Sequence, residues 1–100
     1  MSAVLKKIST PQQIEDLRAE IDSVDKELIA LLEKRASLVF AIGDYKKKYN
    51  MPIHDPVREL KIRSKIKNLV TPEGPLKTCE MESLVMTIVE RFRFFLKVFT

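Results

Sequence analysis

The sequence predicts an all-α protein built from three helices, one of them very long. Apolar residues recur at spacings of three and four along most of the 100 residues, and no segment alternates as a half-buried strand does. The chain has only two glycines, Gly43 and Gly74, and its five prolines lie outside the long periodic segments. So few turn-forming residues favour long, uninterrupted helices. We expect one helical domain over residues 1–100.

The first helix is expected over about residues 11–49, after a flexible N-terminus at residues 1–9. Thr10 is a hydroxyl cap, and Pro11 suits the first helical position. Apolar residues then follow in steps of three and four: Ile14, Leu17, Ile21, Val24, Leu28, Leu31, Leu38, Ile42, Tyr45 and Tyr49. Such a helix is roughly 58 Å long, whereas a compact domain of this size has a radius of gyration of ~13 Å. Its apolar stripe therefore needs a second chain, and we expect an intertwined helical homodimer.

Two shorter helices follow the long one. The second begins at Asp55-Pro56, again a cap followed by proline, and runs to about Val70. The segment 71–75 holds two prolines and a glycine and is expected to be a loop. The third helix extends from about residue 76 or 78 to residue 98, with apolar residues at helical spacing.

The composition limits the kinds of partner. The lone Cys79 excludes an internal disulfide framework and favours a reducing compartment. The sequence has no signal peptide and no apolar run of ~18 residues, so we expect a soluble, cytoplasmic protein without a membrane partner. With one histidine, one cysteine and no glycine-rich phosphate loop, we expect neither a metal nor a cofactor. The net charge of +4 favours an anionic partner.

Arg35 is the sole interruption of the apolar series in the long helix, at the step between Leu31 and Leu38. A guanidinium in an apolar seam is costly unless an anion meets it. One interpretation is a buried ion pair with a glutamate of a neighbouring helix. The other is a ligand carboxylate, whose geometry the arginine fork matches.

Lys46 is a second candidate for contact with the same ligand. It lies eleven residues after Arg35, or three helical turns, so both side chains project from nearly the same face about 16 Å apart along the axis. Side chains of this length can converge on one small molecule between them. Lys46 begins a run of three lysines, and we expect the other two, Lys47 and Lys48, to be solvated surface residues.

Asp55, Arg58 and Glu59 share one face of the second helix, at positions i, i+3 and i+4. Together they place two carboxylates and one guanidinium beside whatever that helix covers. The acids can accept a hydrogen bond from a ligand hydroxyl, and the arginine can bind a ligand carboxylate. Each acid also has a structural interpretation, because Asp55 is suited to cap the helix and Glu59 to pair with Arg63.

Arg18 is a candidate only if two chains combine. It precedes Arg35 by 17 residues, which places it about 25 Å away and rotated by roughly 100° on the same helix. The two therefore cannot reach one small molecule from a single chain. In an antiparallel dimer, Arg18 could reach the pocket of the partner. Otherwise it pairs with Glu15 or Asp22.

In this order the residues resemble the all-helical family of chorismate mutases. The similarity runs without a gap from about residue 14 to 60, and the helical pattern continues beyond it. The matching positions are Leu17-Arg18, Ile21, Val24-Asp25, Leu28 to Arg35, Gly43, Lys46 and Pro52-Ile53-His54-Asp55-Pro56-Val57-Arg58-Glu59.

The resemblance implies a role for each basic candidate. Arg35 and Arg58 would hold the two carboxylates of chorismate, and Arg18 would arrive from the other subunit of a homodimer. Lys46 would donate to the ether oxygen of the enolpyruvyl group. Catalysis would consist of holding the compact conformer and stabilising negative charge on that oxygen.

The resemblance also implies roles for the acids. Asp55 and Glu59 would contact the ring hydroxyl and the network on the ether side. Glu59 would thus join Arg35 and Lys46 as a catalytic group. The product would be prephenate, on the route to aromatic amino acids, and neither metal nor cofactor would take part.

The third helix departs from the family pattern, which has a small polar residue there and, four positions later, a glutamine or glutamate that contacts the ether oxygen. Phe92 and Leu96 occupy these places in our register. Arg93 or Lys97 could substitute if the register differs by one residue. Without such a donor, the resemblance implies a weak mutase or a related substrate, since one such donor is worth ~3 kcal/mol.

Three alternatives remain. An isochorismate-pyruvate lyase of the same fold typically lacks the acids at the positions of Asp55 and Glu59. A mutase of 4-amino-4-deoxychorismate would suit the two acids as well. A basic helical dimer that binds nucleic acid or a protein partner is favoured by the net charge. However, acids interleave with the bases instead of leaving one basic stripe, so we expect no nucleic acid partner.

Overall fold

The structure, a computed structural model, describes residues 7–99, and the side chains of residues 7–98. It consists of the helices α1 (Pro11–Lys48), α2 (Pro56–Leu69) and α3 (Thr78–Phe99). The described part contains no strand, so the all-α prediction is confirmed. Of the N-terminal segment expected to be flexible, residues 1–6 lie outside the described residues. Residues 7–9 precede α1 without regular structure.

Local capping interactions set the helix starts, as the sequence predicts. At α1, the Thr10 hydroxyl accepts from the backbone N–H of Gln13 at 3.3 Å, and the Gln13 side chain accepts from the backbone N–H of Thr10 at 3.0 Å. At α2, Asp55 accepts from the backbone N–H of Arg58 at 3.0 Å. The turn after α1 contains Asn50 at φ 53°, a left-handed conformation that asparagine tolerates.

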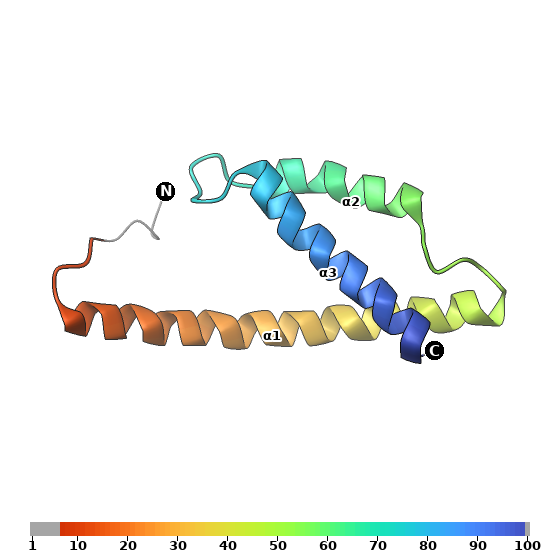
Figure 1. Cartoon of the computed structure of the whole chain (residues 1–100), viewed down its shortest axis with the longest axis horizontal. Coiled ribbons are helices and arrows are strands. Elements are labelled where there is room, and N and C mark those ends of the chain that lie inside the picture. The colour runs from red at the N-terminus through yellow and green to blue at the C-terminus, as the bar shows by residue number, and fades with distance from the viewer. Residues whose placement is uncertain (1–6, 100) are drawn as a thin grey trace.

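The long helix α1 is a rod that the other two helices cover only in part (Figure 1). α3 packs against both α1 and α2, and it runs obliquely from near the C-terminal end of α2 to the C-terminal half of α1. The molecule measures 58 × 26 × 16 Å, with a radius of gyration of 17.6 Å. A compact chain of this length would have a radius of ~13 Å. The N-terminal half of α1 therefore projects beyond the other helices.

The core is small and lies along α3. The buried apolar residues among those described are Ile66, Met86 and Leu96. Gly43 of α1 is also buried, and a Cβ atom there would lie 2.5 Å from Leu96 Cδ2. The missing side chain thus permits the close approach of α1 and α3 at the point where Leu96 sits.

The apolar stripe of α1 is largely uncovered within one chain. Ile21, Val24, Leu31 and Leu38 are 56%, 61%, 63% and 60% exposed. Such a run of exposed large apolar side chains is typical of a surface that another chain covers. In the described part of the chain, no helix has the length and apolar character needed to cross a membrane.

Candidate active site

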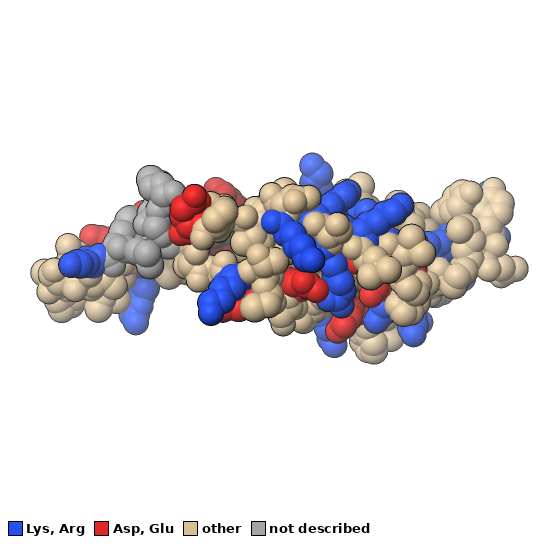
Figure 2. All heavy atoms as spheres, turned by 90° about the horizontal axis from the view of Figure 1, so that it is seen from above, with Lys and Arg blue, Asp and Glu red and all other residues tan. Residues whose placement is uncertain are grey.

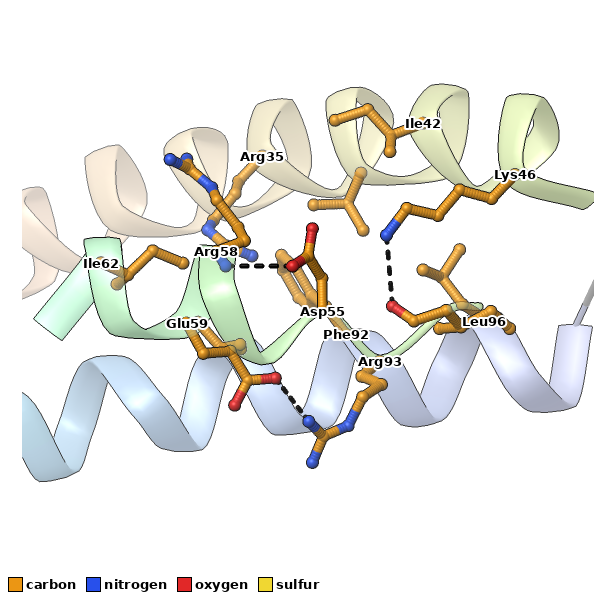
Figure 3. Close-up of a pocket in the computed structure, with 13 residues that line it drawn as sticks. Arg35, Ile42, Lys46, Asp55, Arg58, Glu59, Ile62, Phe92, Arg93 and Leu96 are labelled. Carbon is orange, nitrogen blue, oxygen red and sulfur yellow. Dashed lines mark hydrogen bonds and ion pairs between the residues drawn. The ribbon is translucent and has the colours of Figure 1, made fainter. Parts of the chain in front are cut away.

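A pocket lies between α1, α2 and α3, and most of the predicted site residues line it (Figure 3). Its polar lining contains Arg35, Lys46, Asp55, Arg58 and Glu59, all predicted from the sequence. They come from α1, from the cap of α2 and from α2 itself. Residues that are 24 positions apart in the chain, such as Arg35 and Glu59, thus face one cavity.

Arg35 is the residue that most needs a ligand. Its Nη1 atom is buried and has no hydrogen-bond partner among the residues that the structure describes. Within the described residues of one chain, no ion pair joins Arg35 to a glutamate, so the structure gives this interpretation no support. Burial lowers the pKa of Arg35, and the nearby charge of Arg58 lowers that pKa further. Both effects disfavour the cation, and an anion bound in the pocket would relieve both.

The ring of Phe92 provides the closest support for this cation. The Arg35 Cζ atom lies 5.0 Å from the ring centroid, within the range of a cation–π contact. Such a contact orients the guanidinium but leaves its charge unneutralised. Arg35 is thus held at the pocket wall with donor capacity to spare.

Lys46 lies at the opposite end of the pocket and is partly buried. Its Nζ atom donates to the backbone carbonyl of Ile53 at 3.3 Å, which ties the side chain to the loop before α2. An ammonium group has three donors, so two remain for a ligand. Of the three consecutive lysines only Lys46 lines this pocket, whereas Lys47 lines a neighbouring one and Lys48 Nζ lies 5.5 Å from the centroid of the Tyr49 ring.

Asp55 and Arg58 combine a structural role with a place in the pocket. Asp55 Oδ1 caps α2, as one of the two interpretations proposed. The same side chain still lines the pocket beside Arg58. The guanidinium of Arg58 is close enough to Arg35 to lower its pKa, so two positive charges stand near each other. A pair of adjacent cations is suited to a ligand with two carboxylates.

Glu59 pairs with a residue of α3 and not with Arg63 of its own helix. Its Oε2 atom accepts from Arg93 Nη1 at 2.5 Å and lies 3.3 Å from His54 Nε2. The structural alternative, a pair with Arg63, is wrong, because Arg63 pairs with Glu82 of α3, also at 2.5 Å. His54 is thus next to the site.

The α3 side of the pocket is mainly apolar. Phe92 and Leu96 both line it, and the register of α3 relative to the family pattern stays a prediction. Lys97 lies outside this pocket and lines a neighbouring one, whereas Arg93 does line it. Sequence reasoning missed the rest of the apolar wall, which comprises Val39, Ile42, Ile53, Ile62 and Val89. Helical spacing from Arg35 could have identified Val39 and Ile42.

Arg18 is not part of the pocket of its own chain. Its side chain is 68% exposed, and Nη1 lies 3.0 Å from Glu15 Oε1. This is one of the two local pairings that the sequence suggested. A role for Arg18 in a second subunit stays a prediction.

The complete polar lining has four basic and two acidic side chains, facing a wall of aliphatic and aromatic groups. This combination suits a small, partly apolar molecule with more than one negative charge. The sequence model of the family described as chorismate mutase type II matches residues 17–95. The chain belongs to this family. The predicted resemblance is therefore confirmed.

Known proteins similar to this chain carry the same family name. A bifunctional chorismate mutase/prephenate dehydratase of Aquifex aeolicus is 47% identical over 58 residues, which are 58% of this chain and 16% of that protein. A chorismate mutase of Methanocaldococcus jannaschii is 31% identical over 58 residues, which are 58% of this chain and 59% of that protein. The chain thus spans a small part of the bifunctional relative and somewhat over half of the other.

The fold is similar to that of solved chorismate mutases. One structure of the enzyme from Thermus thermophilus superposes with a TM-score of 0.77 and 28% sequence identity, over 85% of this chain and 94% of that one. A second form of the Thermus enzyme gives a TM-score of 0.72 at 29% identity, over 80% of this chain and 98% of that one. In this chain the apolar pair Phe92 and Leu96 lines the pocket from α3.

Proposed function

We propose that this chain is a chorismate mutase, which rearranges chorismate to prephenate in the pocket between its three helices. One observation carries the proposal: the guanidinium of Arg35 is partly buried, and its Nη1 atom has no acceptor within the described residues. A buried donor without a partner costs about 1–3 kcal/mol. A ligand carboxylate in the pocket satisfies this donor, and family membership identifies chorismate as the ligand.

Arg35 and Arg58 bind the two carboxylates of chorismate in this proposal. Their proximity, which lowers the pKa of Arg35, is unfavourable in the empty site. A dianion placed between them converts this repulsion into attraction. The planar guanidinium groups also fix the orientation of each carboxylate through paired hydrogen bonds.

Lys46 acts on the bond that breaks. In the rearrangement, the ether C–O bond breaks while a C–C bond forms within the same molecule, and no proton moves to or from a side chain. Electron density accumulates on the ether oxygen in the transition state. The Lys46 ammonium donates to this oxygen and stabilises the developing charge. The tie of Lys46 to the Ile53 carbonyl holds the donor in place before the substrate arrives.

Asp55 and Glu59 accept from the ring hydroxyl and adjoin the network on the ether side. The apolar wall formed with Phe92 and Leu96 packs against the ring and excludes water. Together the polar and apolar groups hold the enolpyruvyl arm over the ring, in the compact conformer that reacts. Restricting the substrate in this way lowers the entropic part of the barrier.

We propose that the active form is a homodimer in the cytoplasm, with Arg18 of each subunit completing the site of the other. The exposure of the α1 stripe supports the dimer, since Leu28, Leu31 and Ile42 are 48%, 63% and 57% exposed in one chain. The extended shape supports it as well, because the 38-residue helix α1 runs along a molecule 58 Å long and α2 and α3 cover only part of it. The exposed, unpaired Cys79 agrees with a reducing compartment.

The distribution of charge argues against nucleic acid as the partner. On the face that α2 and α3 form, acidic side chains interrupt the basic ones (Figure 2). A nucleic-acid interface usually presents a continuous basic stripe or patch. The lyase alternative is disfavoured because Asp55 and Glu59 both line the pocket.

The test is to follow the loss of chorismate absorbance with the purified chain and to identify the product, with isochorismate in a parallel reaction. We expect prephenate from chorismate and no pyruvate from isochorismate. Release of pyruvate from isochorismate, without prephenate formation, would replace the mutase with the lyase. Absence of turnover of both, with no binding of chorismate by calorimetry, would contradict the proposal.

A further inference from the structure

We propose that Arg93 is a positioning residue that holds Glu59 and balances its charge, and so makes the site prefer a ligand with a ring hydroxyl over one with an ammonium group there. The inference rests on the proposed function and deepens it, because it names the group that the acidic end of the pocket selects. The resemblance to the family left this choice open, since two acids suit a hydroxyl and an amine alike.

The contact between the two side chains is direct and partly buried. Arg93 Nη1 lies 2.5 Å from Glu59 Oε2, and the side chains are 25% and 19% exposed. Figure 3 shows the two pointing toward each other, Arg93 from α3 and Glu59 from α2, at the edge of the pocket that both line. Solvent screens such a pair less than a pair on the open surface.

The two oxygens of Glu59 are used unequally. Oε2 receives Arg93 Nη1 and also lies 3.3 Å from His54 Nε2. Within the described residues, Oε1 has no hydrogen bond or ion pair. A carboxylate that is clamped through one oxygen presents the other in a fixed direction. Glu59 is thereby an oriented acceptor, whose Oε1 is available to a donor on the ligand.

Charge then decides which donor is preferred. Asp55 and Glu59 alone would place two negative charges at this end of the pocket and would attract an ammonium group strongly. The guanidinium of Arg93 cancels most of the field of Glu59 and repels a second cation. A hydroxyl is neutral, so it loses little from the presence of Arg93 and keeps its hydrogen bond to the carboxylate.

A second ion pair between α2 and α3 provides a control, because it bridges the same two helices away from the pocket. Arg63 Nη1 lies 2.5 Å from Glu82 Oε1, with side chains 43% and 26% exposed. Neither residue lines the pocket. If Arg93 merely joined α2 to α3, loss of Arg63 would have the same consequences as loss of Arg93.

The experiment compares chorismate with 4-amino-4-deoxychorismate, in which an amine replaces the ring hydroxyl. Calorimetry gives Kd for each ligand, and kinetics give kcat/KM where turnover occurs, for the wild-type chain, Arg93→Gln, Arg93→Lys and Arg63→Gln. We expect Arg93→Gln to shift the ratio of affinities toward the amine by roughly tenfold, because one charge beside the binding group is removed. Arg93→Lys retains the charge and should restore the wild-type preference, and Arg63→Gln should leave the preference unchanged.

A preference in Arg93→Gln equal to that in Arg63→Gln, while the wild-type chain converts chorismate, would overturn the role of Arg93 and leave the mutase assignment intact. A wild-type chain that neither binds nor converts chorismate overturns both. If Arg93→Gln fails to fold by circular dichroism, Glu59→Gln decides. It leaves Arg93 unopposed and should shift the ratio away from the amine, so an unchanged ratio in that variant contradicts the inference.

Discussion

The guanidinium carbon of Arg35 lies 5.0 Å from the centroid of the Phe92 ring. This contact joins the cation that interrupts the α1 stripe to an aromatic residue of α3 that lines the same pocket. Phe92 orients Arg35 through the face of its ring but supplies no negative charge, so the guanidinium remains ready for a ligand. Phe92 therefore supports a basic residue of the site without neutralising its charge.

Phe92→Leu should raise KM for chorismate more than it lowers kcat. The substitution keeps the wall apolar but removes a cation–π contact worth about 1 kcal/mol, which corresponds to roughly fivefold in binding. Steady-state kinetics measure the effect. Phe94→Leu is the matched control, because the Phe94 ring makes a similar contact with Arg91, at 5.2 Å, and does not line the pocket. Equal effects of the two substitutions would argue against support of Arg35 by Phe92.

Leu96→Gln should raise kcat. The amide would add a donor on the ether side of the pocket, where Leu96 now presents only methyl groups, and such a donor is worth up to about a hundredfold in rate. Stability should fall somewhat, because Leu96 is only 6% exposed and the amide is unsatisfied in the empty site. Leu84→Gln on the exposed side of α3 controls for the residue type. An unchanged kcat would mean that the ether oxygen lies away from residue 96.

Arg18→Ala and Arg35→Ala should complement each other when mixed. Each substitution alone removes a group that every site needs, so both homodimers should be inactive. A mixed dimer has one site with both arginines intact, so random exchange of subunits should restore about a quarter of the wild-type activity. The measurement is turnover after joint unfolding and refolding of the two variants. No recovery in the mixture, or full activity of Arg18→Ala alone, would exclude a contribution from the partner.

Much of the fold follows from local sequence, because capping and periodicity are short-range. Thr10 and Asp55 mark the starts of α1 and α2 as predicted, and α1 ends at Lys48, one residue before the expected end. Most of the polar residues that line the pocket were also predicted from the sequence, whereas most of the apolar wall was not. The positions of these polar residues on helix faces follow from a period of ~3.6 residues once the helices are assigned.

The partners of charged residues were not predictable in the same way. The structural alternative for Glu59 was a pair with Arg63 on its own helix, but α3 brings Arg93 to it across 34 residues of chain. An i,i+4 pair is weak, worth only ~0.2–0.5 kcal/mol, so a tertiary contact readily replaces it. Whether Arg35 meets a protein carboxylate also depends on how the three helices pack. The residue pattern of one helix does not predict that packing.

The account depends on Arg35 carrying a charge that the folded chain does not neutralise. Its lowered pKa means that the unfolded chain holds this proton more tightly than the folded chain. The free energy of unfolding therefore increases with pH only in the alkaline range between the pKa of Arg35 in the folded chain and its higher pKa in the unfolded chain. Below that range, at neutral pH, the charged Arg35 imposes a constant cost on folding. Removing the guanidinium should relieve this cost.

Arg35→Ala, measured in parallel for chorismate turnover, Tm and sedimentation, is the most direct test of this claim. We expect turnover to fall by at least about a hundredfold, as for loss of a preorganised electrostatic contact. The helical spectrum and the dimer should persist, with Tm equal to or above that of the wild-type chain. A variant that unfolds or dissociates, or one that still converts chorismate at the wild-type rate, would contradict the central claim.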